Sequence, residues 1–220
     1  MIMDNMATGH EFPARDRHVL DNMILTSSGA TAEIIRQTFF SGETVIVKRA
    51  KQPNFNPFLR SEYEILLELN TDPECPKSIP KVYADFPPRD ANVDVYAFQE
   101  EDLTRYSPLL NRDGKNTAML EGLNEKKRLI ILGRICWCMT YITSKGFIHN
   151  DLQLSNILFR ESNVDTKIID WAVSRRAVKE TAFADVHKLT EMILSLFVEI
   201  VIPRPVENWM AKVKKNEFLT

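Results

Sequence analysis

The sequence has little of what would mark a membrane, secreted or nucleic-acid-binding protein. Its longest apolar run, residues 192–202, carries Ser195 and Glu199 and is too short to cross a bilayer. Residues 1–18 contain no apolar core of the kind that a signal peptide needs. The formal net charge is −2 and the basic residues are scattered, so no nucleic-acid or membrane partner is indicated.

The cysteines are also few, and their spacing does not suggest a structural role. There are three, an odd number, and Cys136 and Cys138 flank a tryptophan rather than forming a metal-type pair. Reduced thiols are therefore expected, which is the usual state in the cytoplasm or nucleus. We expect a cytoplasmic or nuclear protein with no signal peptide or transmembrane segment.

What the sequence does contain is a polar motif set in apolar flanks. Residues 149–158 read HNDLQLSNIL, and Asp170 follows after a short hairpin. Asp151 could accept the proton of an attacking hydroxyl, while Asn156 and Asp170 could hold Mg²⁺ against phosphates. His149 is expected to pack under the loop and tie the Asp170 segment to it. This ordered set predicts phosphoryl transfer from Mg-ATP, with a purely structural polar loop as the alternative.

A lysine and a carboxylate nearer the N-terminus fit the same chemistry. Lys48 closes a strand-like segment that follows a glycine-containing turn, a position that would aim its ammonium at the α- and β-phosphates. Glu62 lies inside the next helical segment, and an ion pair with Lys48 would fix the lysine's position. Glu64 is the alternative partner.

Two stretches of backbone are expected to complete a nucleotide site. The small residues of the turn that starts at Ser27 would let the backbone approach the phosphates, although one glycine in a hairpin is a weak signal. The backbone around Gln99, Glu100 and Asp102 is where an adenine edge could hydrogen-bond. An ordinary linker between lobes is the alternative for that segment.

The periodicity of apolar residues divides the chain into a strand-rich half and a helical half. In the first half, a strand-like pattern begins at residue 23, strands are expected at 33–40, 44–48, 81–86 and 93–98, and a helix at 58–69. In the second half, helices are expected at 126–144, 184–200 and 206–215, and short strands at 157–159 and 167–169. Gly146 is a natural stop for the first of these helices.

Taken together, these residues resemble the protein-kinase superfamily over about residues 25–197. The resemblance implies an α+β, two-lobed protein-kinase-like fold with residues 1–21 as an extension, 22–101 as the N-lobe and 102–220 as an abbreviated C-lobe. It implies ATP and Mg²⁺ as cofactors, and Asp185 as an anchor for the backbone of the catalytic loop. The expected site comprises catalytic Asp151 and Lys48, metal-binding Asn156 and Asp170, and nucleotide-binding Ser27, Ser28, Gly29, Ala30, Ile34, Ile46, Lys48, Glu62, Gln99, Glu100 and Asp102.

The chain also departs from the usual pattern of that superfamily. Ile46 stands where a small residue normally covers adenine, and Gln153 stands where a lysine is usual. The metal-binding triplet of residues 170–172 reads Asp-Trp-Ala instead of Asp-Phe-Gly. The step from Asp170 to Asp185 is so short that no long activation loop can fit.

Two compact groups share this short step. The chain is similar to the small kinase of the KEOPS tRNA-modification complex and to minimal effector kinases of enteric pathogens, which act inside a host cell. Its Ile-Asp-Trp element also resembles antibiotic and choline phosphotransferases. The expected function is an atypical serine/threonine protein kinase that acts on a protein substrate or with a regulatory protein partner. The alternatives are a pseudokinase binding module and a small-molecule phosphotransferase.

Overall fold

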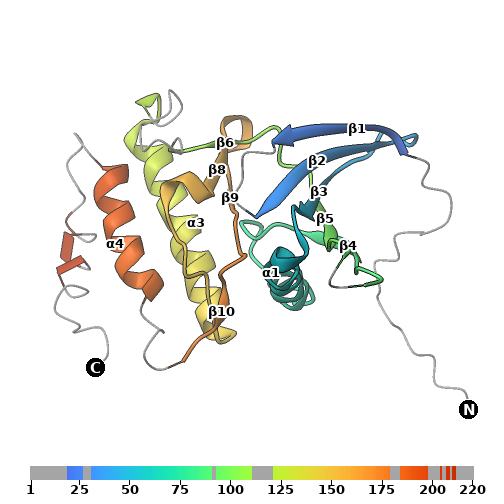
Figure 1. The fold of residues 1–220 in the computed structure, drawn as a ribbon. Coiled ribbons are helices and arrows are strands. Elements are labelled where there is room, and N and C mark those ends of the chain that lie inside the picture. Colours follow the sequence, from blue (N-terminus) through green and yellow to red (C-terminus); the bar gives the residue numbers. More distant parts are fainter. Residues whose placement is uncertain are drawn as a thin grey trace, which may run out of the picture.

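The chain folds into a strand-rich lobe and a helix-rich lobe that lie side by side (Figure 1). The structure is a computed structural model that describes residues 19–26, 31–90, 93–110, 121–178 and 184–197, together with residues 204, 207–208 and 210–211. The two-lobed α+β fold that the sequence predicts is confirmed.

The strand-rich lobe is an antiparallel sheet with one covered face. Within the described residues the sheet has five strands in the order β1-β2-β3-β5-β4. Gly42 has a φ of +82° in the turn between β2 and β3, a conformation that glycine adopts without strain. The strands are β1 (Val19–Thr26), β2 (Ala32–Phe39), β3 (Thr44–Ala50), β4 (Val82–Phe86) and β5 (Ala97–Glu101).

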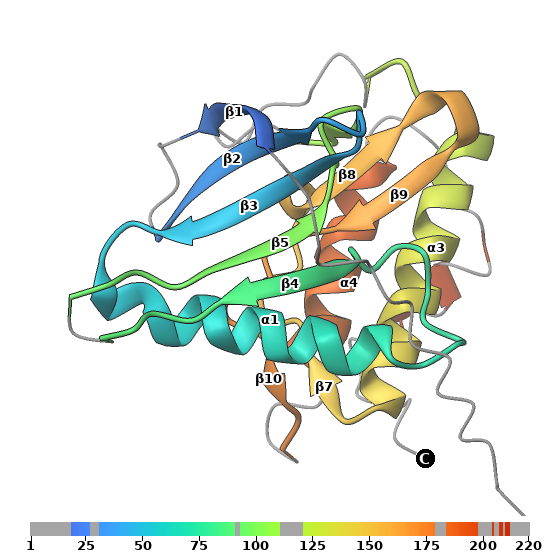
Figure 2. The same ribbon diagram turned by 90° about the vertical axis from the view of Figure 1, so that its right-hand side faces the viewer.

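Helix α1 (Asn56–Asn70), preceded by the 3₁₀ turn η1 (Pro53–Phe55), packs on one face of this sheet (Figure 2). Its apolar residues recur at helical spacing, so that one side of the helix is buried. Leu59 and Tyr63 join Ala50 and Phe98 of the sheet in a small apolar cluster. The helix predicted over residues 58–69 is therefore present and positions Glu62 toward the sheet.

Strand β5 starts four residues later than the strand predicted over residues 93–98. The side chain of Asn56 accounts for the difference. Its amide nitrogen donates to the Asp94 carbonyl at 2.9 Å, and its oxygen accepts from the Tyr96 N–H at 2.7 Å. A helix residue therefore takes backbone groups that a longer strand would have used in its ladder.

Strand β1 starts inside the segment that was predicted to be an N-terminal extension over residues 1–21. Val19 pairs with Phe39 and Asp21 with Thr38 across the β1–β2 ladder. The predicted boundary at residue 22 is therefore too late, since the sheet already includes Val19. The signal was weak because residues 19–25 of the strand are all exposed and show no buried alternation.

In the part of the helical lobe that the structure describes, two long helices are accompanied by several short strands. Asn124 caps α3 by accepting a hydrogen bond from the Lys127 N–H, and Gly146, with a φ of +77°, follows its end as predicted. Residues 198–200 of the predicted second helix lie outside the described residues, as does most of the predicted 206–215 helix. The elements are α3 (Glu125–Ser144), α4 (Ala184–Leu196), β6 (Ser107–Pro108), β7 (Phe147–Ile148), β8 (Ile157–Arg160), β9 (Asp165–Ile168), β10 (Arg175–Arg176), η2 (Leu154–Asn156) and η3 (Glu161–Asn163).

One apolar core runs through both lobes. Leu66 and Leu69 of α1 belong to the same buried cluster as Ile131 and Ile135 of α3 and Trp171. The lobes are thus joined by packing as well as by the connecting chain. No helix in the ranges described above is both long enough and apolar enough to cross a membrane.

Neighbouring leucines on α1 test this shared core. Leu66 is 0% exposed and Leu67 is 42% exposed. Leu66→Ala should lower the free energy of unfolding by about 2–5 kcal/mol, because it leaves a cavity where the lobes meet. Leu67→Ala should lower it by less than about 1 kcal/mol. Urea denaturation of both variants measures the difference, and equal effects would contradict the packing described here.

Candidate active site

Lys48 and Glu62 form a buried ion pair between β3 and α1. The Lys48 ammonium lies 2.7 Å from Oε1 of Glu62, and the two residues are 9% and 2% exposed. This is the partner that the sequence predicts. The alternative, Glu64, is exposed and pairs with Arg60 on the surface of α1.

The same carboxylate reaches the segment that carries Asp170. The backbone N–H of Trp171 donates to Oε1 of Glu62 at 3.2 Å. The Trp171 ring is fully buried, donates to the Ile168 carbonyl at 2.8 Å and meets the His149 ring edge-on at 4.7 Å. Asp170 itself is exposed and has a φ of +67°. Its backbone is therefore fixed by its neighbours, and its charge is close enough to Lys48 to raise the pKa of that lysine.

A second buried carboxylate approaches Lys48 from β5. Glu100 is 4% exposed, and its Oε2 lies 3.4 Å from the Lys48 ammonium. That contact is an ion pair without hydrogen-bond geometry. Oε2 of Glu100 is thus one of two buried side-chain polar atoms that have no hydrogen bond in the described residues. Sequence reasoning considered only the backbone of Glu100. It missed the side chain because the pairing of β5 with β3 is a long-range property.

The charges in this cluster perturb one another. Burial would lower the pKa of Lys48, but the charges of Glu100 and Glu62 and the hydrogen bond to Glu62 outweigh it and raise that pKa above its usual value. Burial raises the pKa of Glu100 to about 7, although the charge of Lys48 acts in the opposite direction. The lysine thus stays charged, while the ionised form of Glu100 is costly.

Asp185 holds the backbone of the loop that follows β7. Its two carboxylate oxygens accept from the N–H groups of His149 at 2.5 Å and Asn150 at 2.8 Å. Asn150 has a φ of +66°, so these charge-assisted bonds hold a left-handed backbone conformation, which asparagine adopts more readily than most residues other than glycine. The anchoring role that the kinase resemblance implies for Asp185 is therefore present as a set of contacts.

The His149 ring links this loop to the Asp170 segment, as predicted. Its Nε2 lies 3.1 Å from the Ile169 carbonyl, and its Nδ1 lies 3.4 Å from the Asp151 N–H. Because a carbonyl only accepts and an N–H only donates, Nε2 carries the proton and Nδ1 is the acceptor. Burial lowers the pKa of His149, which agrees with this neutral form.

The Asp151 carboxylate is held by two amides. Asn156 Nδ2 donates to its Oδ2 at 2.8 Å and to its backbone carbonyl at 2.9 Å. Gln153 Nε2 donates to both carboxylate oxygens at 3.1 Å. Since the amide nitrogen of Asn156 points at Asp151, its amide oxygen is the atom that could bind a cation.

The donor set of the site fits Mg²⁺ held jointly with phosphates. In the described parts of the chain, no group of three or more His, Cys, Asp or Glu side chains could hold a metal ion. Mg²⁺ commonly takes only one or two protein oxygens and completes its shell with substrate phosphates and water. Asn156 and Asp170, the predicted metal-binding residues, could supply such a pair.

The other predicted nucleotide-binding residues are distributed as follows. Ser27, Ser28, Gly29 and Ala30 lie outside the described residues. Ile46 lies two residues before Lys48 on β3, and Ile34 of β2 lies directly opposite Lys48. The side chains of Gln99 and Asp102 bond to Gln37 at 2.9 Å and Arg36 at 3.0 Å. Gln99 is also paired with Val47 and with Ala84 in the sheet, so a contact of its backbone with a base would compete with strand pairing.

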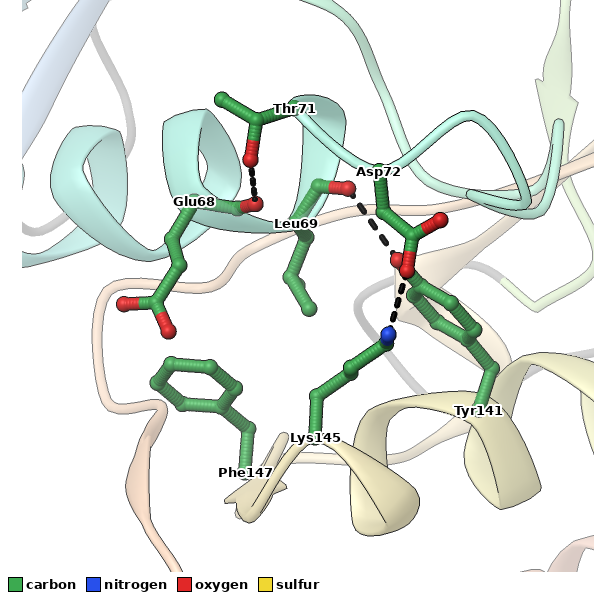
Figure 3. A pocket seen from close by; sticks show the side chains of 7 residues that line it. All are labelled: Glu68, Leu69, Thr71, Asp72, Tyr141, Lys145 and Phe147. Atoms are coloured by element: carbon green, nitrogen blue, oxygen red, sulfur yellow. Dashed lines mark hydrogen bonds and ion pairs between the residues drawn. The ribbon is translucent and has the colours of Figure 1, made fainter.

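A separate pocket of about 340 Å³ lies between the ends of α1 and α3 (Figure 3). Its polar groups bond to one another: Lys145 pairs with Asp72, and the Tyr141 hydroxyl donates to the Leu69 carbonyl at 3.2 Å. These contacts join the lobes. The pocket contains none of the predicted site residues.

Comparison with known proteins points to one family. The sequence pattern of the protein tyrosine and serine/threonine kinase family matches residues 29–194. The chain is 29% identical over 152 residues to the probable serine/threonine-protein kinase fhkA of Dictyostelium discoideum, which covers 66% of this chain and 24% of that protein. It is 33% identical over 93 residues to the putative serine/threonine-protein kinase L232 of Acanthamoeba polyphaga mimivirus, covering 40% of this chain and 14% of that protein. The matched region is thus a quarter or less of each relative's length.

The raised pKa of Glu100 predicts a pH-dependent stability. The folded state holds the Glu100 proton more tightly than the unfolded chain, so this residue lowers stability as pH rises from about 4.5 to about 7. Glu100→Gln should therefore gain stability relative to the wild type between pH 5 and pH 8, by on the order of 1–3 kcal/mol.

Chemical denaturation at the two pH values measures this gain. Glu101→Gln is the matched control, because Glu101 is the next residue of β5 and pairs with Lys167 instead. A Glu100→Gln variant whose difference from the wild type is the same at both pH values would contradict the assignment.

Proposed function

The chain belongs to the protein tyrosine and serine/threonine kinase family, and from that premise we propose that it transfers the γ-phosphoryl group of ATP to a serine or threonine hydroxyl of a protein. The observation that carries the proposal is the double contact of Glu62. One buried oxygen positions both the lysine expected at the phosphates and the segment with the metal-binding aspartate. Such convergence is what phosphoryl transfer requires, because the catalysis is mainly positioning and charge stabilisation.

Each charged group in the site then has a defined role. Lys48 would bind the α- and β-phosphates while Glu62 keeps its ammonium in place. Asn156 and Asp170 would hold Mg²⁺, which neutralises charge on the phosphates when bound. His149 and Asp185 touch no reacting atom and act as positioning residues for the loop.

Asp151 is the group expected to take the proton in the transfer step. The bond from the γ-phosphorus to the β–γ bridging oxygen breaks, a bond from phosphorus to the acceptor hydroxyl forms, and the hydroxyl proton passes to Asp151. A carboxylate has about four acceptor positions, and Gln153 and Asn156 occupy three of them. One position is left for the acceptor hydroxyl.

A second candidate function is nucleotide binding without transfer. Gln153 supports it, because a neutral amide that donates to both oxygens of Asp151 competes with an acceptor hydroxyl. Gln153 also lacks the positive charge that a lysine at this position would bring to the transferred phosphoryl group. In that case the chain would act as a binding module that regulates a partner.

We also propose that the acceptor or regulator is a protein. The support is the printed description of both relatives as serine/threonine-protein kinases. The short step from Asp170 to Asp185 adds to it, since a face that a long activation loop would cover is open to a partner. A small-molecule acceptor would instead need a pocket built from this chain alone.

Two substitutions separate binding from transfer. Asp151→Asn should reduce phosphoryl transfer by about 10²-fold or more while Mg-ATP affinity stays nearly unchanged, because Asp151 acts on the nucleophile. Asp170→Ala should weaken Mg-ATP binding itself. Thermal-shift titration measures binding, since a ligand at one hundred times its Kd stabilises the native state by about 2.7 kcal/mol. Radiolabel transfer to protein measures catalysis.

The pattern of results distinguishes the candidate functions. Binding in the wild type without any measurable transfer would favour the regulatory binding module. Absence of any shift at millimolar Mg-ATP would contradict both candidates. Equal transfer by the wild type and both variants would mean that the activity comes from a contaminant.

A further inference from the structure

Glu100 is an anomaly that the proposed reaction does not explain. Phosphoryl transfer needs one carboxylate beside Lys48, and Glu62 fills that place with a 2.7 Å hydrogen bond. Glu100 is a second, almost fully buried carboxylate with one oxygen that has no hydrogen bond. A buried acceptor without a hydrogen bond costs free energy. Its ion-pair partner in the protein is the Lys48 ammonium at 3.4 Å, so a ligand that brings a hydrogen-bond donor would stabilise it.

The sheet register places the side chain of Glu100 on the nucleotide face. Lys48 lies directly opposite Phe98 and Ile46 directly opposite Glu100 in the β3–β5 ladder. Side chains of directly opposed residues share one face, and residues two apart on a strand share it too. Lys48, Phe98, Ile46 and Glu100 therefore form one continuous patch, and Glu101 points to the other face.

The position of Glu100 along this patch matches the nucleoside end of a nucleotide. Glu62 and Trp171 lie on the side of Lys48 that leads to the Asp170 segment, which would face the terminal phosphates. The base must then extend away from that segment, along the patch toward Ile46 and Glu100. This is also the end of β5, next to the chain that leads into the helical lobe.

Binding of a triphosphate would leave Glu100 without its present partner. The Oε2 atom is 3.4 Å from the Lys48 ammonium, and that ammonium would turn toward the phosphates. A buried carboxylate would then need a hydrogen-bond donor. A base with an exocyclic amino group brings one, whereas a base with a keto oxygen at that position brings a second acceptor and repulsion.

We propose that the Glu100 carboxylate accepts a hydrogen bond from the exocyclic amino group of the bound base and so selects a 6-aminopurine over a 6-oxopurine nucleotide. This inference rests on the proposed nucleotide-binding function and deepens it, by assigning base specificity to a side chain. Glu100 is thus a specificity residue in addition to any contact made by its backbone.

Three nucleotides isolate the contribution of the amino group. ATP carries it, inosine triphosphate replaces it with a keto oxygen, and purine riboside triphosphate has only hydrogen there. Competition against a fluorescent ATP analogue at pH 8, with Mg²⁺, gives the relative affinities. The wild type should prefer ATP over purine riboside triphosphate by roughly tenfold or more, as expected for a hydrogen bond to a charged acceptor.

Two variants show whether Glu100 is the source of that preference. Glu100→Met removes the acceptor, so ATP and purine riboside triphosphate should become nearly equal. Glu100→Gln can donate as well as accept, so the preference for ATP over inosine triphosphate should fall by roughly tenfold. Glu101→Gln is the control and should keep the wild-type ratios, because its side chain lies on the opposite face and pairs with Lys167.

The outcomes separate this inference from the function on which it rests. Wild-type ratios in both Glu100 variants would overturn the inference while ATP binding stood. Equal losses for all three nucleotides would also overturn it, because Glu100 would then act only through Lys48. Failure of the wild type to bind any of them would remove the proposed function and the inference together.

Discussion

The site depends on one buried carboxylate oxygen. Oε1 of Glu62 accepts from the Lys48 ammonium at 2.7 Å and from the Trp171 N–H at 3.2 Å. A strand of one lobe, the helix that packs on it and the segment after Asp170 therefore meet at a single atom. Loss of that oxygen would leave the buried Trp171 N–H without its acceptor and the buried Lys48 ammonium with only the longer contact to Glu100 at 3.4 Å, and both changes are costly.

Weaker contacts nearby also hold the segment after Asp170 against α1. Arg176 of β10 donates to both carboxylate oxygens of Glu68 on α1, at 2.9 and 2.8 Å. This pair is 64% and 52% exposed at its side chains, so it contributes little on its own. The Arg176–Glu68 pair and the apolar core that α1 shares with α3 together hold the segment after Asp170 against α1. These contacts need no bound ligand. The short step to Asp185 is compatible with such a fixed arrangement.

Sequence reasoning succeeded where the determinants are local. The spacing of Asp151, Asn156 and Asp170 placed the loop correctly, and apolar periodicity predicted α1 and the choice of Glu62, whose neighbours Ile65 and Leu66 are buried. Sequence reasoning failed where contacts between distant segments determine the structure. The late start of β5 follows from a bond of Asn56 across the lobe, and the carboxylate of Glu100 enters the site only through the β3–β5 register. Neither can be read from spacing along the chain.

The most direct test of this account compares two glutamates on the same helix. Glu62 is buried against Lys48, whereas Glu64 is exposed and pairs with Arg60. Calorimetric titration with Mg-ATP should show that Glu62→Gln lowers affinity by about tenfold or more, because Lys48 loses the charge that holds it. Glu64→Gln should bind as the wild type does. Unchanged affinity in Glu62→Gln, with its fold intact, would contradict the central role of this carboxylate.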